Sequence, residues 1–256
     1  MNTLLTPEQA AACHRDGYVI ARAFFDSEDM RILQTYARAD PILQQSAFLR
    51  ADTQGGAAKM TLWNDAGDDL YGIVSRTNKL ADTAEQLLGA EPYHWHHKMS
   101  MKEPLTGGAW EWRQDYGYWY MNGCLFPDLI SAFIAIDRNT RENGCMQVIR
   151  GSHLMGRIEH GQFGDQVGAD PERVNEALKV LLLDYAVLKP GDVLFFHSNS
   201  LHCSDQNKSS EPRWSLICCY NTRHNSPYKK GRHPAYTPLE RLPDDAIKAF
   251  GQRVGV

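Results

Sequence analysis

The spacing of hydrophobic positions changes near Tyr93. Before this point, apolar residues recur at helical intervals behind a capping residue, as in Met30, Leu33 and Ala37 behind Asp26. This spacing predicts helices over about 7–16, 26–38 and 77–88. Beyond it, short apolar segments separated by turn residues predict strands over 92–102, 108–118, 129–137, 145–149, 185–189, 192–197 and 213–222.

Helices followed by many strands indicate helices packed outside a closed or double-sheet β core. We therefore predict one mainly β domain over 1–256, with a helical part over about 1–90, a β core over about 91–225 and a tail over 226–256. A long insert over 152–184, with a short helix predicted at 171–183, interrupts the strands. Inserts of this length in compact domains often form lids or binding loops.

Composition excludes several classes of partner. Hydrophobic residues make up 43% and charged residues 23% of the 256 residues, with a net charge of −4. These values are typical of a globular protein and do not indicate a surface for nucleic acid or an anionic membrane. The sequence contains no apolar run of membrane-spanning length and no signal peptide, so we predict a cytoplasmic protein. None of the six cysteines forms a CxxC pair, so we expect reduced, mostly buried thiols, with the adjacent Cys218 and Cys219 on opposite faces of a strand.

Two distant segments carry candidate chemistry. The segment 107–120 contains Asp115, and the segment 191–204 contains His202. A carboxylate and an imidazole from two strands suit a facial Fe(II) site, which needs three protein ligands and leaves open positions for other groups. A third ligand is expected two residues before Asp115, on the same strand face. That position holds Arg113, which has no lone pair to offer a metal.

These segments resemble the phytanoyl-CoA dioxygenase family of Fe(II)/2-oxoglutarate oxygenases. The family pattern is HxD, a distant histidine, and an arginine eleven residues later, which here correspond to Arg113, Asp115, His202 and Arg213. The stretches WRQDY at 112–116, RENGCMQVIRGSH at 141–153 and PGDVLFFH at 190–197 resemble family segments, and the resemblance covers about 10–225. It implies a double-stranded β-helix (jelly-roll, cupin-like) core, iron and 2-oxoglutarate as cofactors, and hydroxylation of a small molecule with conversion of 2-oxoglutarate to succinate.

The resemblance also implies residues for the co-substrate. Arg213 is expected to bind the 5-carboxylate of 2-oxoglutarate through two parallel donors, with help from the Ser204 hydroxyl. Lys98, Ser100 and Trp110 are expected to face the same co-substrate.

Candidate substrate residues lie near the motifs. Three aromatic residues beside Asp115 either line a substrate pocket or belong to the core, and two polar residues open the long insert: Tyr116, Tyr118, Trp119, His153 and Arg157. The cluster His94, His96 and His97 is interpreted as a strand with alternating faces. The sequence has no obvious basic cluster, which argues against a CoA thioester as substrate. The oligomeric state stays open.

Arg113 leaves three interpretations. The first is an oxygenase whose iron site is weakened or lost, and the second is a rearranged site completed by Glu111 or a water. In the third, Arg113 pairs with Asp115 and the pocket binds an anion or dicarboxylate or performs redox-neutral chemistry without metal. We predict an Fe(II)/2-oxoglutarate oxygenase compromised by Arg113, with a metal-free binding protein as the alternative.

Overall fold

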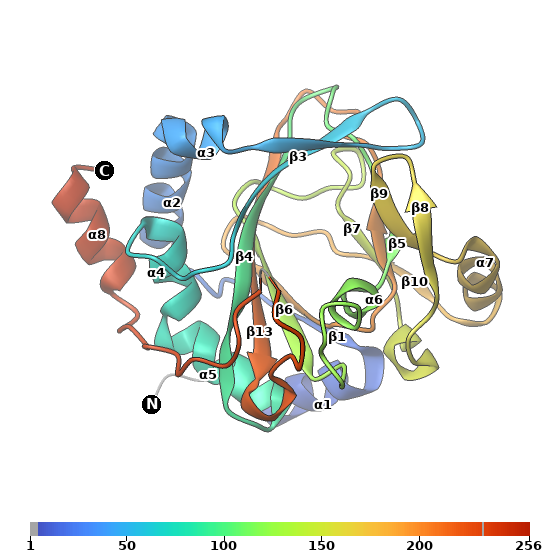
Figure 1. The fold of residues 1–256 in the computed structure, drawn as a ribbon. Helices are drawn as coiled ribbons and strands as arrows, with labels where there is room; N and C mark the ends of the chain where they lie inside the picture. The colour runs from blue at the N-terminus through green and yellow to red at the C-terminus, as the bar shows by residue number, and fades with distance from the viewer. Residues whose placement is uncertain (1–4, 232) are drawn as a thin grey trace.

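Two antiparallel sheets face each other across a central space (Figure 1). The computed structural model describes residues 5–231 and 233–256. The larger sheet has seven strands in the order β1 (Tyr18–Ala21), β11 (Val193–His197), β6 (Leu129–Ala135), β13 (Arg213–Thr222), β4 (Pro92–Lys102), β3 (Ala57–Trp63) and β2 (Phe48–Ala51). The smaller has four, in the order β10 (Leu183–Tyr185), β7 (Met146–Ile149), β12 (His202–Ser204) and β5 (Trp110–Arg113).

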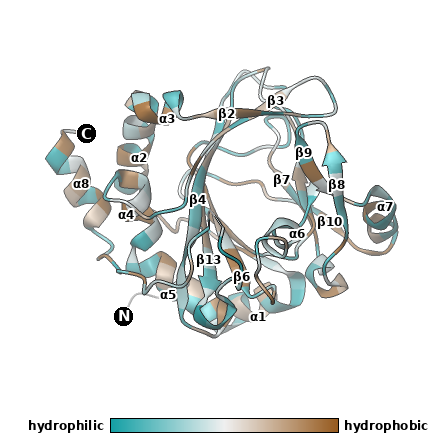
Figure 2. Cartoon of the chain, in the orientation of Figure 1, coloured by the Kyte–Doolittle hydropathy of each residue, from teal (hydrophilic) through white to brown (hydrophobic). Residues whose placement is uncertain are grey.

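Helices cover the outer face of the larger sheet. They are α1 (Pro7–Asp16), α2 (Ser27–Ala39), α3 (Pro41–Gln45), α4 (Leu70–Arg76) and α5 (Asn78–Leu88), and α8 (Ala246–Val254) packs on α2 and α4. In Figure 2, apolar and polar residues alternate along α2 and α8, as expected of helices with one buried side. The predicted class, mainly β with flanking helices, is confirmed.

Local sequence explains the best-predicted elements. The Thr6 side chain accepts from the Gln9 amide in a capping box, and Gly17 ends α1 with φ of +82°. Strands β6 and β13 are buried along their whole length, as their apolar runs predict. Cys218 packs in the core between helices and sheet, whereas Cys219 packs in the core between the two sheets. All six cysteines are buried free thiols, as predicted.

Other elements differ from the prediction. The segment predicted as a strand over 108–118 divides into β5 and a one-turn helix, α6 (Asp115–Trp119). The long insert adds a hairpin of β8 (His160–Phe163) and β9 (Gln166–Ala169) before α7 (Pro171–Val180). Short 3-10 turns lie at Ser152–Met155 and Arg223–Asn225. None of the helices in the described ranges could span a bilayer.

The turn before β11 depends on Gly191. Its φ is +87°, and a Cβ there would lie 2.5 Å from the Phe25 carbonyl oxygen. Replacing Gly191 by alanine should lower the free energy of unfolding by about 1–3 kcal/mol, because both the backbone conformation and the contact become strained. Chemical denaturation measures this loss. Gly161→Ala is the control, since its nearest neighbour would be 3.9 Å away, and equal stability of the two variants would contradict the prediction.

Candidate active site

A cavity of about 590 Å³ lies between the two sheets. Its wall combines strands β4, β5, β12 and β13 with the β2–β3 and β8–β9 hairpins. The predicted iron and co-substrate residues all line it: Lys98, Ser100, Trp110, Arg113, Asp115, His202, Ser204 and Arg213. The sequence therefore located this group correctly, although the chemical roles of these residues stay predictions.

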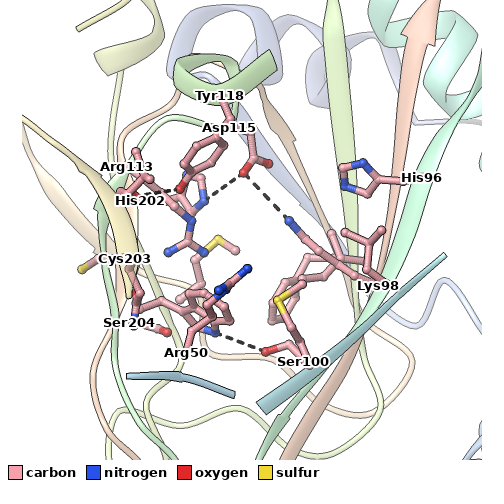
Figure 3. Close-up of a pocket in the computed structure, with 18 of the residues that line it drawn as sticks. Arg50, His96, Lys98, Ser100, Arg113, Asp115, Tyr118, His202, Cys203 and Ser204 are labelled. Carbon is pink, nitrogen blue, oxygen red and sulfur yellow. Dashed lines mark hydrogen bonds and ion pairs between the residues drawn. The ribbon is translucent and has the colours of Figure 1, made fainter. Parts of the chain in front are cut away.

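Asp115 and His202 face each other in the cavity wall (Figure 3). The Asp115 Oδ1 and His202 Nε2 atoms are 3.8 Å apart, and both side chains are buried. His202 Nδ1 lies 2.9 Å from the Ser200 carbonyl oxygen, which can only accept, so Nδ1 carries the proton. Burial and the Arg113 charge lower the pKa of His202 to about 4. Two lone pairs thus face one another, an arrangement that suits a bridging cation or hydrogen-bond donor.

Asp115 is charged despite its burial. Burial raises the pKa of this carboxyl, but the charges of Lys98 and Arg113, the neighbouring His202 imidazole and the Ser131 hydroxyl hold it below its usual value. Ser131 Oγ donates to Oδ2 at 3.1 Å, and Lys98 Nζ lies 4.0 Å from Oδ1. Lys98 is therefore the cation nearest this carboxylate among the ion pairs of the described residues.

Arg113 stands opposite His202 in the β5–β12 register. A register shift next to this pair lets both Trp110 and Arg113 line the cavity, although strict alternation would put them on opposite faces. The guanidinium lies over the Trp110 ring at 4.9 Å and donates to the Glu111 carbonyl oxygen at 3.1 Å. The third interpretation expected Arg113 to pair with Asp115, but the cation that forms an ion pair with this carboxylate among the described residues is Lys98.

The residues present supply only part of an iron site. The described chain contains no group of three histidine, cysteine or acidic side chains placed to hold a metal. Glu111 does not complete the site, because its carboxylate accepts from the amide and hydroxyl of Thr53 and does not line the cavity. Asp115 and His202 are two plausible donors, and the third position holds a cation. A three-ligand iron site therefore does not fit this chain as written.

Arg213 fits a carboxylate. The side chain is 1% exposed. Its Nη2 donates to the Gly144 carbonyl oxygen at 2.9 Å and to Ser204 Oγ at 3.4 Å, whereas Nε has no partner in the described structure. Burial lowers the pKa of Arg213 to about 10, so it stays protonated at neutral pH. A buried guanidinium with a free donor is the partner that a carboxylate needs.

The predicted substrate residues divide into two groups. Tyr118 and Trp119 line the cavity. Tyr116 instead directs its hydroxyl to the carbonyl oxygens of Cys124 and Leu125. His153 contacts the His14 carbonyl oxygen, and Arg157 pairs with Glu159, so these two and Tyr116 lie outside the cavity lining.

Several lining residues escaped the sequence analysis. Arg50 comes from β2, and Gln162 and Gln166 come from the β8–β9 hairpin within the predicted binding insert. His96, which the sequence analysis interpreted only as part of an alternating strand, lines the cavity from β4, and both of its ring nitrogens lack hydrogen-bond partners in the described structure. The glycine pair at 55–56 was the one signal for the β2–β3 hairpin. The remaining contributions depend on tertiary pairing alone.

Buried neutral histidines outside the pair predict acid sensitivity. Burial lowers the pKa of His94 and of His197 to about 4 each. In the unfolded chain the histidine pKa is about 6.5, so between pH 4 and pH 6.5 the unfolded chain binds more protons than the folded protein. The stability that these histidines contribute is therefore complete above about pH 6.5 and is lost as the pH falls toward 4. We expect the melting temperature to drop by at least about 5 °C from pH 7.5 to 5. His197→Gln should reduce the dependence of the melting temperature on pH. A melting temperature of the unmodified protein that does not change with pH would contradict the predicted acid sensitivity.

Facing antiparallel sheets around a cavity with an aspartate–histidine pair and a buried arginine define a class, the double-stranded β-helix oxygenases. The family description "Phytanoyl-CoA dioxygenase (PhyH)" matches residues 13–215, and this chain belongs to that family. The resemblance drawn from the sequence is thereby confirmed.

Named relatives act on small molecules. An L-proline trans-4-hydroxylase from Streptomyces griseoviridis is 30% identical over 192 residues, covering 69% of this chain and 72% of the relative. An ectoine dioxygenase from Bordetella parapertussis is 25% identical over 249 residues, covering 90% and 80%. The family is one of iron- and 2-oxoglutarate-dependent dioxygenases.

Solved structures share the fold. EctD from S. alaskensis with bound Fe superposes with a TM-score of 0.77 at 25% identity, over 95% of this chain and 90% of that one. The epimerase SnoN, in complex with Fe3+, alpha ketoglutarate and nogalamycin RO, has a TM-score of 0.72 at 20% identity, over 92% and 93%. The predicted double-stranded β-helix is confirmed.

Proposed function

We propose that this chain is a hydroxylase-type Fe(II)/2-oxoglutarate oxygenase for a small molecule, with an iron site weakened by Arg113. The observation that carries the proposal is the unpartnered Nε of buried Arg213 beside Ser204, in the cavity that also holds the Asp115–His202 pair. A pocket that keeps a carboxylate anchor is expected to bind the family's co-substrate. A single domain over 1–256 and a cytoplasmic location stay predictions from the sequence.

The chain's own residues would bind and orient the co-substrate. Arg213 and Ser204 would hold the 5-carboxylate of 2-oxoglutarate. Trp110 donates to Ser100 Oγ at 3.4 Å, and this pair would form one wall along the co-substrate. When bound, iron together with 2-oxoglutarate and O₂ would supply the oxidation of a C–H bond, and the residues of this cavity would contribute binding and orientation.

The substrate is expected on the side of the cavity formed by Tyr118, Trp119 and His96. Two aromatic side chains provide apolar area, and the unpartnered nitrogens of His96 provide hydrogen bonding for one polar group. The relatives that hydroxylate proline or oxidise ectoine support a small, polar substrate.

A second function, metal-free binding, is favoured by one observation. Of the side chains that the structure describes, four cations and two carboxylates line the cavity: Arg50, Lys98, Arg113 and Arg213 against Asp115 and Asp165. Excess positive charge opposes a divalent cation and attracts an anion.

Iron and succinate analysis tests the proposal. The protein is prepared without oxygen in the presence of Fe(II) and 2-oxoglutarate, then bound iron and succinate release after oxygen addition are measured. We expect well below one iron per chain and slow succinate release. One iron per chain with rapid turnover would show that Arg113 does not weaken the site, and absence of 2-oxoglutarate binding would refute the co-substrate assignment.

A further inference from the structure

The net charge of the cavity lining suits a bound dianion in the absence of a metal. Among the described residues that line it, four cations exceed two carboxylates by two charges. A dicarboxylate carries two negative charges and would neutralise this excess by itself. Adding a divalent metal would restore the imbalance, at a cost that increases in a buried site.

Two of these cations surround the position between Asp115 and His202. Lys98 Nζ lies 4.0 Å from Asp115 Oδ1, from the β4 side of the cavity (Figure 3). Arg113 approaches from the opposite sheet, directly across from His202 in the strand register. Together they bring two positive charges to the region where an iron(II) ion would bring two.

Arg113 is also held in place with donors to spare. Its contact with the Trp110 ring and its bond to the Glu111 carbonyl oxygen fix the guanidinium at the cavity wall. That bond uses one of the five N–H donors that a guanidinium carries. A planar guanidinium binds a carboxylate through two parallel bonds, which a histidine at this position cannot do.

The second anchor lies at a suitable distance along the same strand. Ser204 is two residues beyond His202 on β12, which corresponds to about 7 Å. Arg213 donates to Ser204 Oγ at 3.4 Å and has its Nε free. One cationic group thus lies at each end of a short cavity segment, as a small dicarboxylate requires.

We propose that this cavity binds a short dicarboxylate of the 2-oxoglutarate type without metal, with Arg213 and Ser204 on one carboxylate and Arg113 with Lys98 on the other. The inference rests on the proposed co-substrate site at Arg213. It adds that Arg113 replaces the metal as the partner of the second carboxylate.

Calorimetric titration of the full chain with 2-oxoglutarate tests this inference, first in EDTA and then with Fe(II) under anaerobic conditions. We expect binding in EDTA, with less than about a threefold change in Kd when Fe(II) is added. Arg113→His should weaken binding in EDTA by about tenfold, because a charged hydrogen-bonding partner is lost, and Fe(II) should restore it. Arg113→Lys keeps the charge and should keep most of the metal-free affinity.

Arg173→His is the matched control, because Arg173 is exposed on α7, outside the cavity, and it should bind like the unmodified protein. Thermal melting verifies that each variant is folded. Binding by the unmodified protein that requires Fe(II) would overturn this inference and leave the proposed function standing. Unchanged metal-free affinity in Arg113→His would also overturn it, whereas no binding under either condition would overturn both.

Discussion

Replacing Arg113 by histidine is expected to raise bound Fe(II) from well below one to about one ion per chain. The substitution removes a permanent positive charge and adds an imidazole across the strand from His202. Asp115 and His202 already face each other at 3.8 Å, and the proton on His202 Nδ1 leaves Nε2 free to bind. Asp115, His202 and the new imidazole would together supply one carboxylate and two nitrogens, which is the ligand set that Fe(II) favours.

Anaerobic loading followed by metal analysis measures this gain. The double variant Arg113→His with Asp115→Asn is the control, and it should return to low iron because the carboxylate is lost. Succinate release should increase together with iron content in the single variant. An Arg113→His protein that gains no iron would refute the assignment of position 113 to the missing ligand.

Replacing Arg213 by glutamine is expected to weaken 2-oxoglutarate binding by about a hundredfold. Arg213 is fully buried, so its attraction for a carboxylate is little screened by water, and the lost interaction is worth about 3 kcal/mol. Arg213→Lys should lose less, about tenfold, because it keeps the charge without the planar pair of donors. Titration calorimetry gives both values.

Two comparisons separate binding from folding in this experiment. Arg213 also donates to the Gly144 carbonyl oxygen, so the melting temperature of each variant must be measured beside its affinity. Arg223→Gln is the control, because the Arg223 side chain is 66% exposed and pairs with Glu91 at the surface. Affinity in Arg213→Gln equal to that of the control would refute the carboxylate anchor.

Much of the fold followed from local patterns. The strands Pro92–Lys102 and Arg213–Thr222 have the bounds that their apolar runs predicted, and the helix before Gly17 ends where its left-handed glycine predicted. Their alternation or capping is contained within a few residues. Elements whose limits depend on partners elsewhere were harder: α8 lies in the predicted tail, and the β8–β9 hairpin lies in the predicted insert.

The same distinction between local patterns and distant partners applies to the prediction of the site residues. Motif spacing brought Asp115, His202, Ser204 and Arg213 to one cavity, since each lies in a segment with its own pattern. The same reasoning included His153, which contacts the carbonyl oxygen of His14 instead. Proximity along the chain to a motif does not determine which wall a side chain reaches.

The sequence by itself determined the class of fold and the group of motif residues that share the cavity, and it predicts that Arg113 stands at an expected ligand position. Tertiary structure alone decided what that arginine contacts. The register of β5 with β12 sets Arg113 across from His202, the Trp110 ring and the Glu111 carbonyl hold it, and Lys98 from the facing sheet takes the place beside Asp115. The Trp110 and Glu111 contacts lie within β5, but the pairing with His202 and the approach of Lys98 join separate elements of the fold, and this arrangement of charges cannot be read from any one segment.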